Sequence, residues 1–163
     1  MPSRLTKRTA AGAAVAAALL LAGAGCPSSN GDSSGTSDSL PSCPSASEVN
    51  DTLRAELDSP DEKTNGSTRT CTYKVAPGGD EVVISFTTGV SAADFQAAEE
   101  SPGPAGEDAQ PINGLGDAAY SMTSGEAGSE VTTISVLSGT TEVSVQAPLS
   151  LKFVEDLARK LLP

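Results

Sequence analysis

Adjacent carboxylates are the side chains in this sequence that come nearest to a catalytic pattern. Glu99 and Glu100 form one pair, and Glu107 and Asp108 form a second pair shortly after it. Two carboxylates can act as the acid and base of a glycoside hydrolase, or they can bind calcium. Few aromatic residues lie nearby to bind a sugar, and neither pair has the alternating acidic pattern of a calcium loop. We therefore interpret all four as solvated surface around a possible binding loop.

The composition argues against several other chemistries. The 163 residues include no His and no Trp, and aromatic residues make up only 3% of the chain. Without an imidazole, a Ser-His-Asp or Cys-His catalytic centre and a His-ligated zinc site cannot form. The 21 acidic residues outnumber the 10 basic ones and give a net charge of -11, which disfavours nucleic acid as a partner. We expect no cofactor and no bound metal.

The first 25 residues have the layout of an export signal. Arg4, Lys7 and Arg8 provide a positive start, and an uncharged stretch rich in Ala and Leu follows over residues 10–25. This stretch is shorter than the roughly 20 apolar residues that a membrane-spanning helix needs. We therefore predict that residues 1–25 are a cleaved signal peptide.

The end of this segment, residues 19–26, resembles a bacterial lipobox, in which small residues precede a Cys that receives a diacylglyceryl group. Gly23 stands where lipoboxes usually carry Leu. Cleavage after Ala24 by an ordinary signal peptidase is the alternative, and it would release a soluble secreted protein. We favour lipidation of Cys26. Two acyl chains would hold the protein on the lipid bilayer, at the extracytoplasmic face of the cell membrane.

The number of cysteines agrees with lipidation. The chain has three, at Cys26, Cys43 and Cys71, and an odd thiol is a liability in an oxidising compartment. Lipidation of Cys26 leaves Cys43 and Cys71 as a pair. We expect them to form a disulfide, and two buried free thiols are the alternative. No two cysteines have the spacing of a redox or zinc motif.

The remaining chain divides into a tether and a domain. Residues 26–42 contain the lipidated Cys and a run rich in Ser and Gly that cannot bury enough apolar surface to fold, so we predict a flexible tether. Residues 43–163 form the predicted extracytoplasmic domain. Leu, Ile, Val and Phe make up about a fifth of it, which is near the lower limit for a globular core. The expected disulfide is therefore important to its stability.

The first half of this domain carries signals for one helix and two strands. Ser45 and Glu48 have the capping-box spacing that begins a helix, which we predict over residues 46–57. A polar run follows the helix. Alternating apolar residues then predict strands over 69–75 and 81–87, joined by a turn over 76–80.

The second half continues with a helix that begins at Ser91, a strand over 118–122, and a hairpin of strands over 131–137 and 142–147. A last helix begins at Ser150, and its apolar stripe includes Leu151, Val154, Leu157, Ala158 and Leu161. The order αββαβββα predicts an α+β fold. In it, about three helices pack on a mainly antiparallel sheet of about five strands.

The string Gly-Leu-Gly-Asp-Ala-Ala-Tyr over residues 114–120 is the most distinctive local motif. Gly114 and Gly116 could belong to a phosphate-binding G-x-G-x-x-A loop, but the strand before and the helix after such a loop are not expected here. We interpret Gly114, Gly116 and Asp117 as a structural turn with positive φ angles, which directs Ala118 and Tyr120 into the sheet.

These features together resemble small cell-envelope lipoproteins of actinobacteria, a group of largely unassigned function. The resemblance rests on the lipobox-like end at Cys26, the tether, Cys43 and Cys71, the 114–120 string and the C-terminal helix. It implies a binding or accessory role in the envelope and names no ligand.

We therefore expect a non-catalytic module, anchored outside the membrane, that binds an envelope protein, a glycan or a small ligand. Its binding surface would be the face of the sheet or a cleft beside residues 99–113. The alternative is a hydrolase that acts on envelope material through its acidic residues, and a purely structural role is a third hypothesis.

Overall fold

The computed structural model describes residues 40–75, 80–103 and 107–162, and the structural statements below concern these ranges. The predicted signal peptide over 1–25, the lipidated Cys26 and most of the tether lie outside the described residues. So does most of the turn predicted over 76–80.

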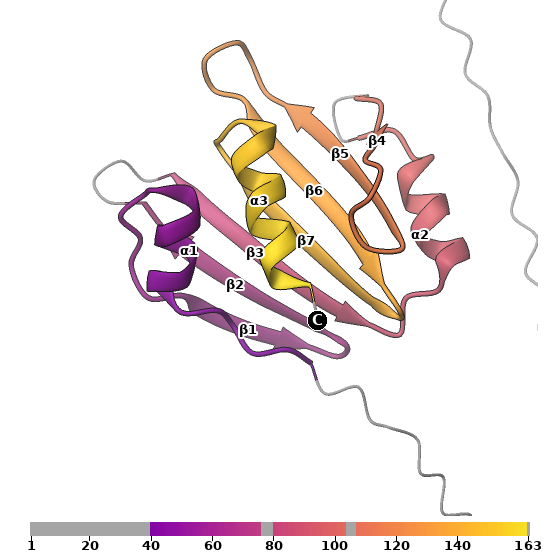
Figure 1. Cartoon of the computed structure of the whole chain (residues 1–163), viewed down its shortest axis with the longest axis horizontal. Helices are drawn as coiled ribbons and strands as arrows, with labels where there is room; N and C mark the ends of the chain where they lie inside the picture. The colour runs from indigo at the N-terminus through magenta and orange to yellow at the C-terminus, as the bar shows by residue number, and fades with distance from the viewer. Residues whose placement is uncertain (1–39, 76–79, 104–106, 163) are drawn as a thin grey trace, which may run out of the picture. The chain divides into compact units, whose positions relative to one another are not determined.

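The described strands form one antiparallel sheet with the order β1-β2-β3-β7-β6-β5-β4 (Figure 1). Their bounds are β1 Asp61–Asn65, β2 Thr68–Lys74, β3 Glu81–Thr88, β4 Gln110–Pro111, β5 Ala118–Ser124, β6 Val131–Ser138 and β7 Thr141–Ala147. In the centre of the sheet β3 pairs with β7, so the β2–β3 hairpin lies beside the β6–β7 hairpin. Strands from the first and second halves of the domain thereby share one continuous sheet.

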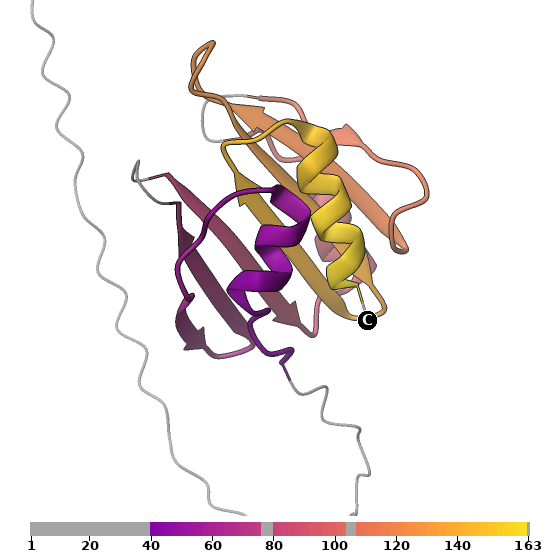
Figure 2. The ribbon, with the colours of Figure 1, turned by 60° about the vertical axis from the view of Figure 1, so that its left-hand side comes forward.

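The described helices are α1 (Ala46–Leu53), α2 (Ala92–Glu99) and α3 (Leu151–Leu161). Both views show α1 and α3 side by side on the same face of the sheet (Figures 1 and 2). In Figure 2 α2 is partly hidden behind the sheet. Within the described ranges, no helix combines the length and apolar character needed to cross a membrane.

The side-chain alternation of the strands explains this division of the helices. Phe95 of α2 packs with Tyr120 and Leu137. Their neighbours in sequence, Ala119 and Val136, belong to the larger core instead. Because successive residues of a strand point to opposite faces, α2 lies on the face opposite to α1 and α3.

The larger core fills the space between the sheet and the helices α1 and α3. Two cross-strand pairs at its centre, Ile134 with Val145 and Val136 with Val143, are fully buried, as the alternation of the hairpin predicts. Most of the predicted stripe of α3 is buried as well. Leu161 is half-buried, and Leu151 is 43% exposed because it occupies the first position of the helix.

The predicted fold class is confirmed, since three helices and one antiparallel sheet form an α+β domain. The predicted width of about five strands is wrong, because the sheet has seven, and the order is αβββαββββα. β1 was expected to be part of a polar run, and all five of its residues are exposed. β4 is only two residues long. Both are edge strands formed by backbone pairing, so neither has an apolar alternation to reveal it.

The first helix is shorter than predicted, because it ends at Leu53 instead of residue 57. Arg54 follows in the left-handed conformation, with φ 55°, and its N–H donates to the carbonyl of Asn50 at 2.7 Å. Leu57 is still buried, but it pairs with Val75 in an isolated bridge. Leu57 therefore lies in an extended segment that folds back toward the sheet.

A disulfide joins the approach to α1 to the sheet. Cys43 and Cys71 are bonded, as the cysteine count predicts, with their Cα atoms 5.8 Å apart. Cys71 is completely buried on β2. The bond therefore anchors the chain three residues before the start of α1.

Two side chains that flank Cys71 on the same face of β2 hold the same segment. The Arg69 guanidinium donates to the carbonyl of Pro41 at 2.9 Å, and the Tyr73 hydroxyl donates to the carbonyl of Pro44 at 2.6 Å. Burial raises the pKa of Tyr73 to about 12, with smaller contributions from nearby carboxylates, so the hydroxyl keeps its proton at neutral pH. Residues 41–44, the approach segment, are thus attached to β2 at three points.

We predict that the double variant Cys43→Ala/Cys71→Ala is less stable than the wild type by about 3.5 kcal/mol, because the bond closes a loop with a sequence separation of 28 residues. Denaturant unfolding followed by circular dichroism measures the difference. Reduction of the wild-type protein is the control, since it breaks the same bond without a substitution. A loss of unfolding free energy below about 1 kcal/mol in both experiments would contradict this prediction. It would show that the hydrogen bonds from Arg69 and Tyr73 are enough to hold the approach segment without the disulfide.

Candidate functional site

Two adjoining pockets lie between α1 and α3, and together they form what we call the α1–α3 groove. The first has a volume of about 290 Å³ and the second of about 560 Å³. Asp51 and Lys160 line both pockets, so the two lie next to each other. Their volumes lie in the range of small-molecule sites in proteins.

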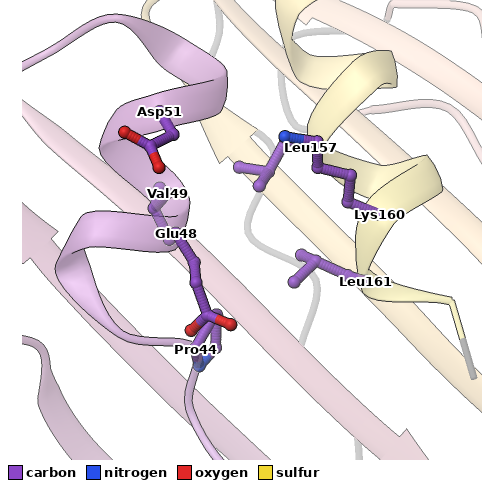
Figure 3. Close-up of a pocket in the computed structure, with 7 residues that line it drawn as sticks. All are labelled: Pro44, Glu48, Val49, Asp51, Leu157, Lys160 and Leu161. Atoms are coloured by element: carbon purple, nitrogen blue, oxygen red, sulfur yellow. The ribbon is translucent and has the colours of Figure 1, made fainter.

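The first pocket has an apolar wall with charges at its rim. The apolar residues are Pro44, Val49, Leu157 and Leu161. Figure 3 shows the two leucines reaching from α3 toward α1. The charged groups that line this pocket are Glu48, Asp51 and Lys160. The pocket therefore offers an apolar surface next to charged groups of both signs.

Glu48 belongs to the capping box of α1, which confirms the interpretation of the Ser45-x-x-Glu48 pattern. Its carboxylate accepts from the Ser45 N–H at 2.8 Å and from the Ser45 hydroxyl at 2.7 Å. These bonds lower the pKa of Glu48, because they stabilise the charged form. In Figure 3 its side chain runs toward Pro44. The Glu48 carboxylate is thus engaged at the helix start.

Lys160 connects the two helices across the groove. Its ammonium donates to the Thr52 hydroxyl at 2.8 Å, and that hydroxyl donates in turn to the carbonyl of Glu48 at 3.1 Å. Within the described ranges the Lys160 ammonium forms no ion pair. The Lys160 ammonium is therefore held by a neutral partner, Thr52.

The second pocket is predominantly cationic. Arg54, Lys152, Arg159 and Lys160 line it, and its carboxylates are Asp51 and Asp156. Only seven Lys and Arg residues follow Cys26 in the whole sequence, so more than half of them gather here. The pocket has a net positive charge on a chain that is strongly acidic.

Two of these cations are paired within α3. The Lys152 ammonium lies 2.9 Å from the Asp156 carboxylate, and the Arg159 guanidinium lies 2.9 Å from that of Glu155. Arg159 also donates to the carbonyl of Gly114 at 3.1 Å. This contact attaches the distinctive 114–120 string to the wall of the groove.

The 114–120 string forms a turn that leads into β5, where a dinucleotide-binding loop would require a helix. Gly114 and Gly116 have φ angles of 77° and 61°. The Asp117 N–H donates to the carbonyl of Leu137 at 2.8 Å, and its carboxylate accepts from the Gly139 N–H at 2.7 Å. The string is thus docked on the β6–β7 hairpin.

The four acidic residues singled out in the sequence lie elsewhere. Glu99 ends α2 and Glu100 caps it, with the Glu100 carboxylate accepting from the Gln96 side chain at 3.0 Å. Glu107 and Asp108 lie between α2 and β4. Because α2 covers the opposite face of the sheet, none of the four lines the α1–α3 groove. In the described part of the chain no three potential ligands are grouped to hold a metal.

Sequence reasoning missed the groove, although it noted some of its residues. Arg159 and Lys160 lie in the last turn of α3, where cations suit the negative end of a helix, so this position alone indicates no binding site. The signal in the sequence is the clustering of rare cations. Only seven Lys and Arg residues follow Cys26, and four of them lie on two short segments. Nothing local indicated that these segments face each other.

We predict that Gly116→Ala destabilises the protein by about 2 kcal/mol more than Gly114→Ala does. Both substitutions carry the cost of a positive φ angle, roughly 1–2 kcal/mol. A Cβ at Gly116 would also meet the Leu137 carbonyl oxygen and the Val136 side chain at 2.5 Å, whereas Gly114 has open space. Denaturant unfolding of the two variants measures the difference. If the two variants lose the same unfolding free energy, the 114–120 string can move away from β6 with little loss of stability.

No protein-family model, no curated protein and no solved structure matches this chain. Its function must therefore be inferred from its own residues. The two features that bear on it are the disulfide-bridged α+β domain and the α1–α3 groove.

Proposed function

We propose that this protein is an exported lipoprotein of the cell envelope, and that its folded domain is a non-catalytic binding or accessory module. Cys26 would carry the lipid, the residues between Cys26 and Leu40 would act as the tether, and the α1–α3 groove would bind the ligand. The tether ends earlier than residue 42 because Leu40 packs on the core and the Pro41 carbonyl accepts from Arg69. The more specific identity, a small actinobacterial envelope lipoprotein, rests on the resemblance described above.

The observation that carries the binding role is the groove itself. It combines an apolar wall with polar groups that converge from two helices, which is the usual composition of a ligand site. The Lys160–Thr52 bond joins those helices, so the site is formed before a ligand arrives. A preformed site loses less entropy on binding, which favours this surface over the loops of the domain.

The disulfide supports the proposed location. Bonds of this kind persist in oxidising compartments and are rare in the cytosol. The Cys43–Cys71 bond also fixes the point at which the domain begins, a short distance after Cys26. Cys26 would then lie at the end of a tether outside the folded domain, where an acyl group does not disturb the core.

We expect Cys26→Ala to remove the protein from the membrane fraction, because Cys26 is the proposed site of both acyl chains. Fractionation and intact-mass measurement check this, since the acyl groups add mass to the wild type. Cys43→Ala/Cys71→Ala should stay in the membrane and serves as the control. A wild-type protein of unacylated mass in the medium would instead support the secreted alternative.

We expect a photo-crosslinking residue at Asp51 to capture an envelope component in living cells, because Asp51 is exposed and lines both pockets. Mass spectrometry identifies the captured component. The matched control is the same residue at Gln146, which is exposed on β7. Identical capture at both positions would contradict a site in the groove. Turnover of cell-wall fragments that is lost in Glu99→Gln or Glu107→Gln would instead favour the hydrolase.

A further inference from the structure

The charges of the groove differ in sign from those of the surrounding protein. After Cys26 the chain has seven Lys and Arg residues and 21 Asp and Glu residues, which gives a net charge of -14. The second pocket, with four cations and two carboxylates, has a net charge of +2. A positive pocket on a negative protein attracts a small anion at short range. The surrounding acidic surface repels polyanions and anionic membranes, because such large partners would contact that surface as well as the pocket.

Two cations of this pocket have their charges available. Lys152 and Arg159 are paired with carboxylates of α3 itself. Arg54 and Lys160 form no ion pair within the described ranges, and they come from opposite sides of the groove. An oxyanion placed between them would accept charge-assisted hydrogen bonds from both helices.

The adjoining pocket supplies a place for an apolar group. Val49, Leu157 and Leu161 line it, and its volume of about 290 Å³ corresponds to about ten water-sized groups. Its carboxylates are Glu48 and Asp51, and Ser45 already occupies that of Glu48. Over both pockets together, four cations and three carboxylates line the groove, so it has a net charge of +1, and the excess of positive charge lies in the second pocket. The charge balance therefore favours an acid over an amine.

We infer that the α1–α3 groove binds a small amphiphilic anion. A carboxylate or phosphate group lies between Arg54 and Lys160, and a short alkyl or similarly apolar body lies against Leu157 and Leu161. This inference rests on the proposed function, because it names the ligand class of the same groove.

Calorimetric titration of the purified protein with octanoate and with octyl phosphate tests the ligand class. We expect both to bind, and we expect octanol and octylammonium to bind at least about tenfold more weakly, because neither supplies an oxyanion. Inorganic phosphate should also bind more weakly, since it lacks the apolar body. Comparison of octanoate with octyl phosphate shows which head group the site prefers.

Lys160→Met should weaken the binding of octanoate about tenfold or more, because it removes the charge and keeps the apolar stem. Arg54→Asn should have a similar effect, and Asn tolerates the positive φ angle at this position. The control is Lys63→Met, which removes the same charge from the exposed strand β1. Equal weakening in Lys160→Met and Lys63→Met would overturn the inference, since it would show a non-specific effect of net charge.

Three further outcomes would also overturn it. Octylammonium could bind as tightly as octanoate, or the Cys26→Ala protein could bind vesicles of anionic phospholipid in preference to octanoate. The third outcome is that neither octanoate nor octyl phosphate binds. If the crosslinker at Asp51 still captures an envelope component in that case, the ligand class is wrong and the binding role stands. If it captures none, the proposed function fails as well.

Discussion

The attachment of the approach segment to β2 is the constraint on which the rest of this domain depends. A disulfide and two hydrogen bonds, from alternate residues on one face of the strand, hold residues 41–44 in place. The helix that follows has only eight residues, and a helix of that length is not stable in water without tertiary support. The attachment places α1 over the sheet, and α1 supplies one wall of the groove.

The topology of the sheet supplies the other wall. β3 and β7 pair in the centre, so the hairpin next to α1 and the hairpin that leads into α3 share one surface. The Lys160–Thr52 bond across the groove therefore joins residues separated by 108 positions in the sequence. The 114–120 string adds a third support, because the Gly114 carbonyl accepts from Arg159 while Asp117 holds the β6–β7 turn.

The balance of charge links this architecture to function. The chain after Cys26 is strongly acidic, whereas four of its seven cations are concentrated where two helices face each other. Lys152 and Arg159 are paired with carboxylates of α3 itself, so their charges are balanced within that helix. Lys160 is different, because a hydroxyl of α1 orients it and its ammonium has no ion pair in the part of the chain that the structure describes.

Local patterns in the sequence determined much of this fold. The capping box at Ser45, the alternation of β3, β6 and β7, and the pairing of two cysteines depend on neighbouring residues or simple counting, and the structure contains all three. The exposed edge strand β1 and the groove could not be predicted in this way. β1 exists because β2 offers an unpaired edge, and the groove exists because distant residues meet across the sheet. Only tertiary structure decides such contacts, since backbone pairing and long-range proximity leave no periodic signal in the chain.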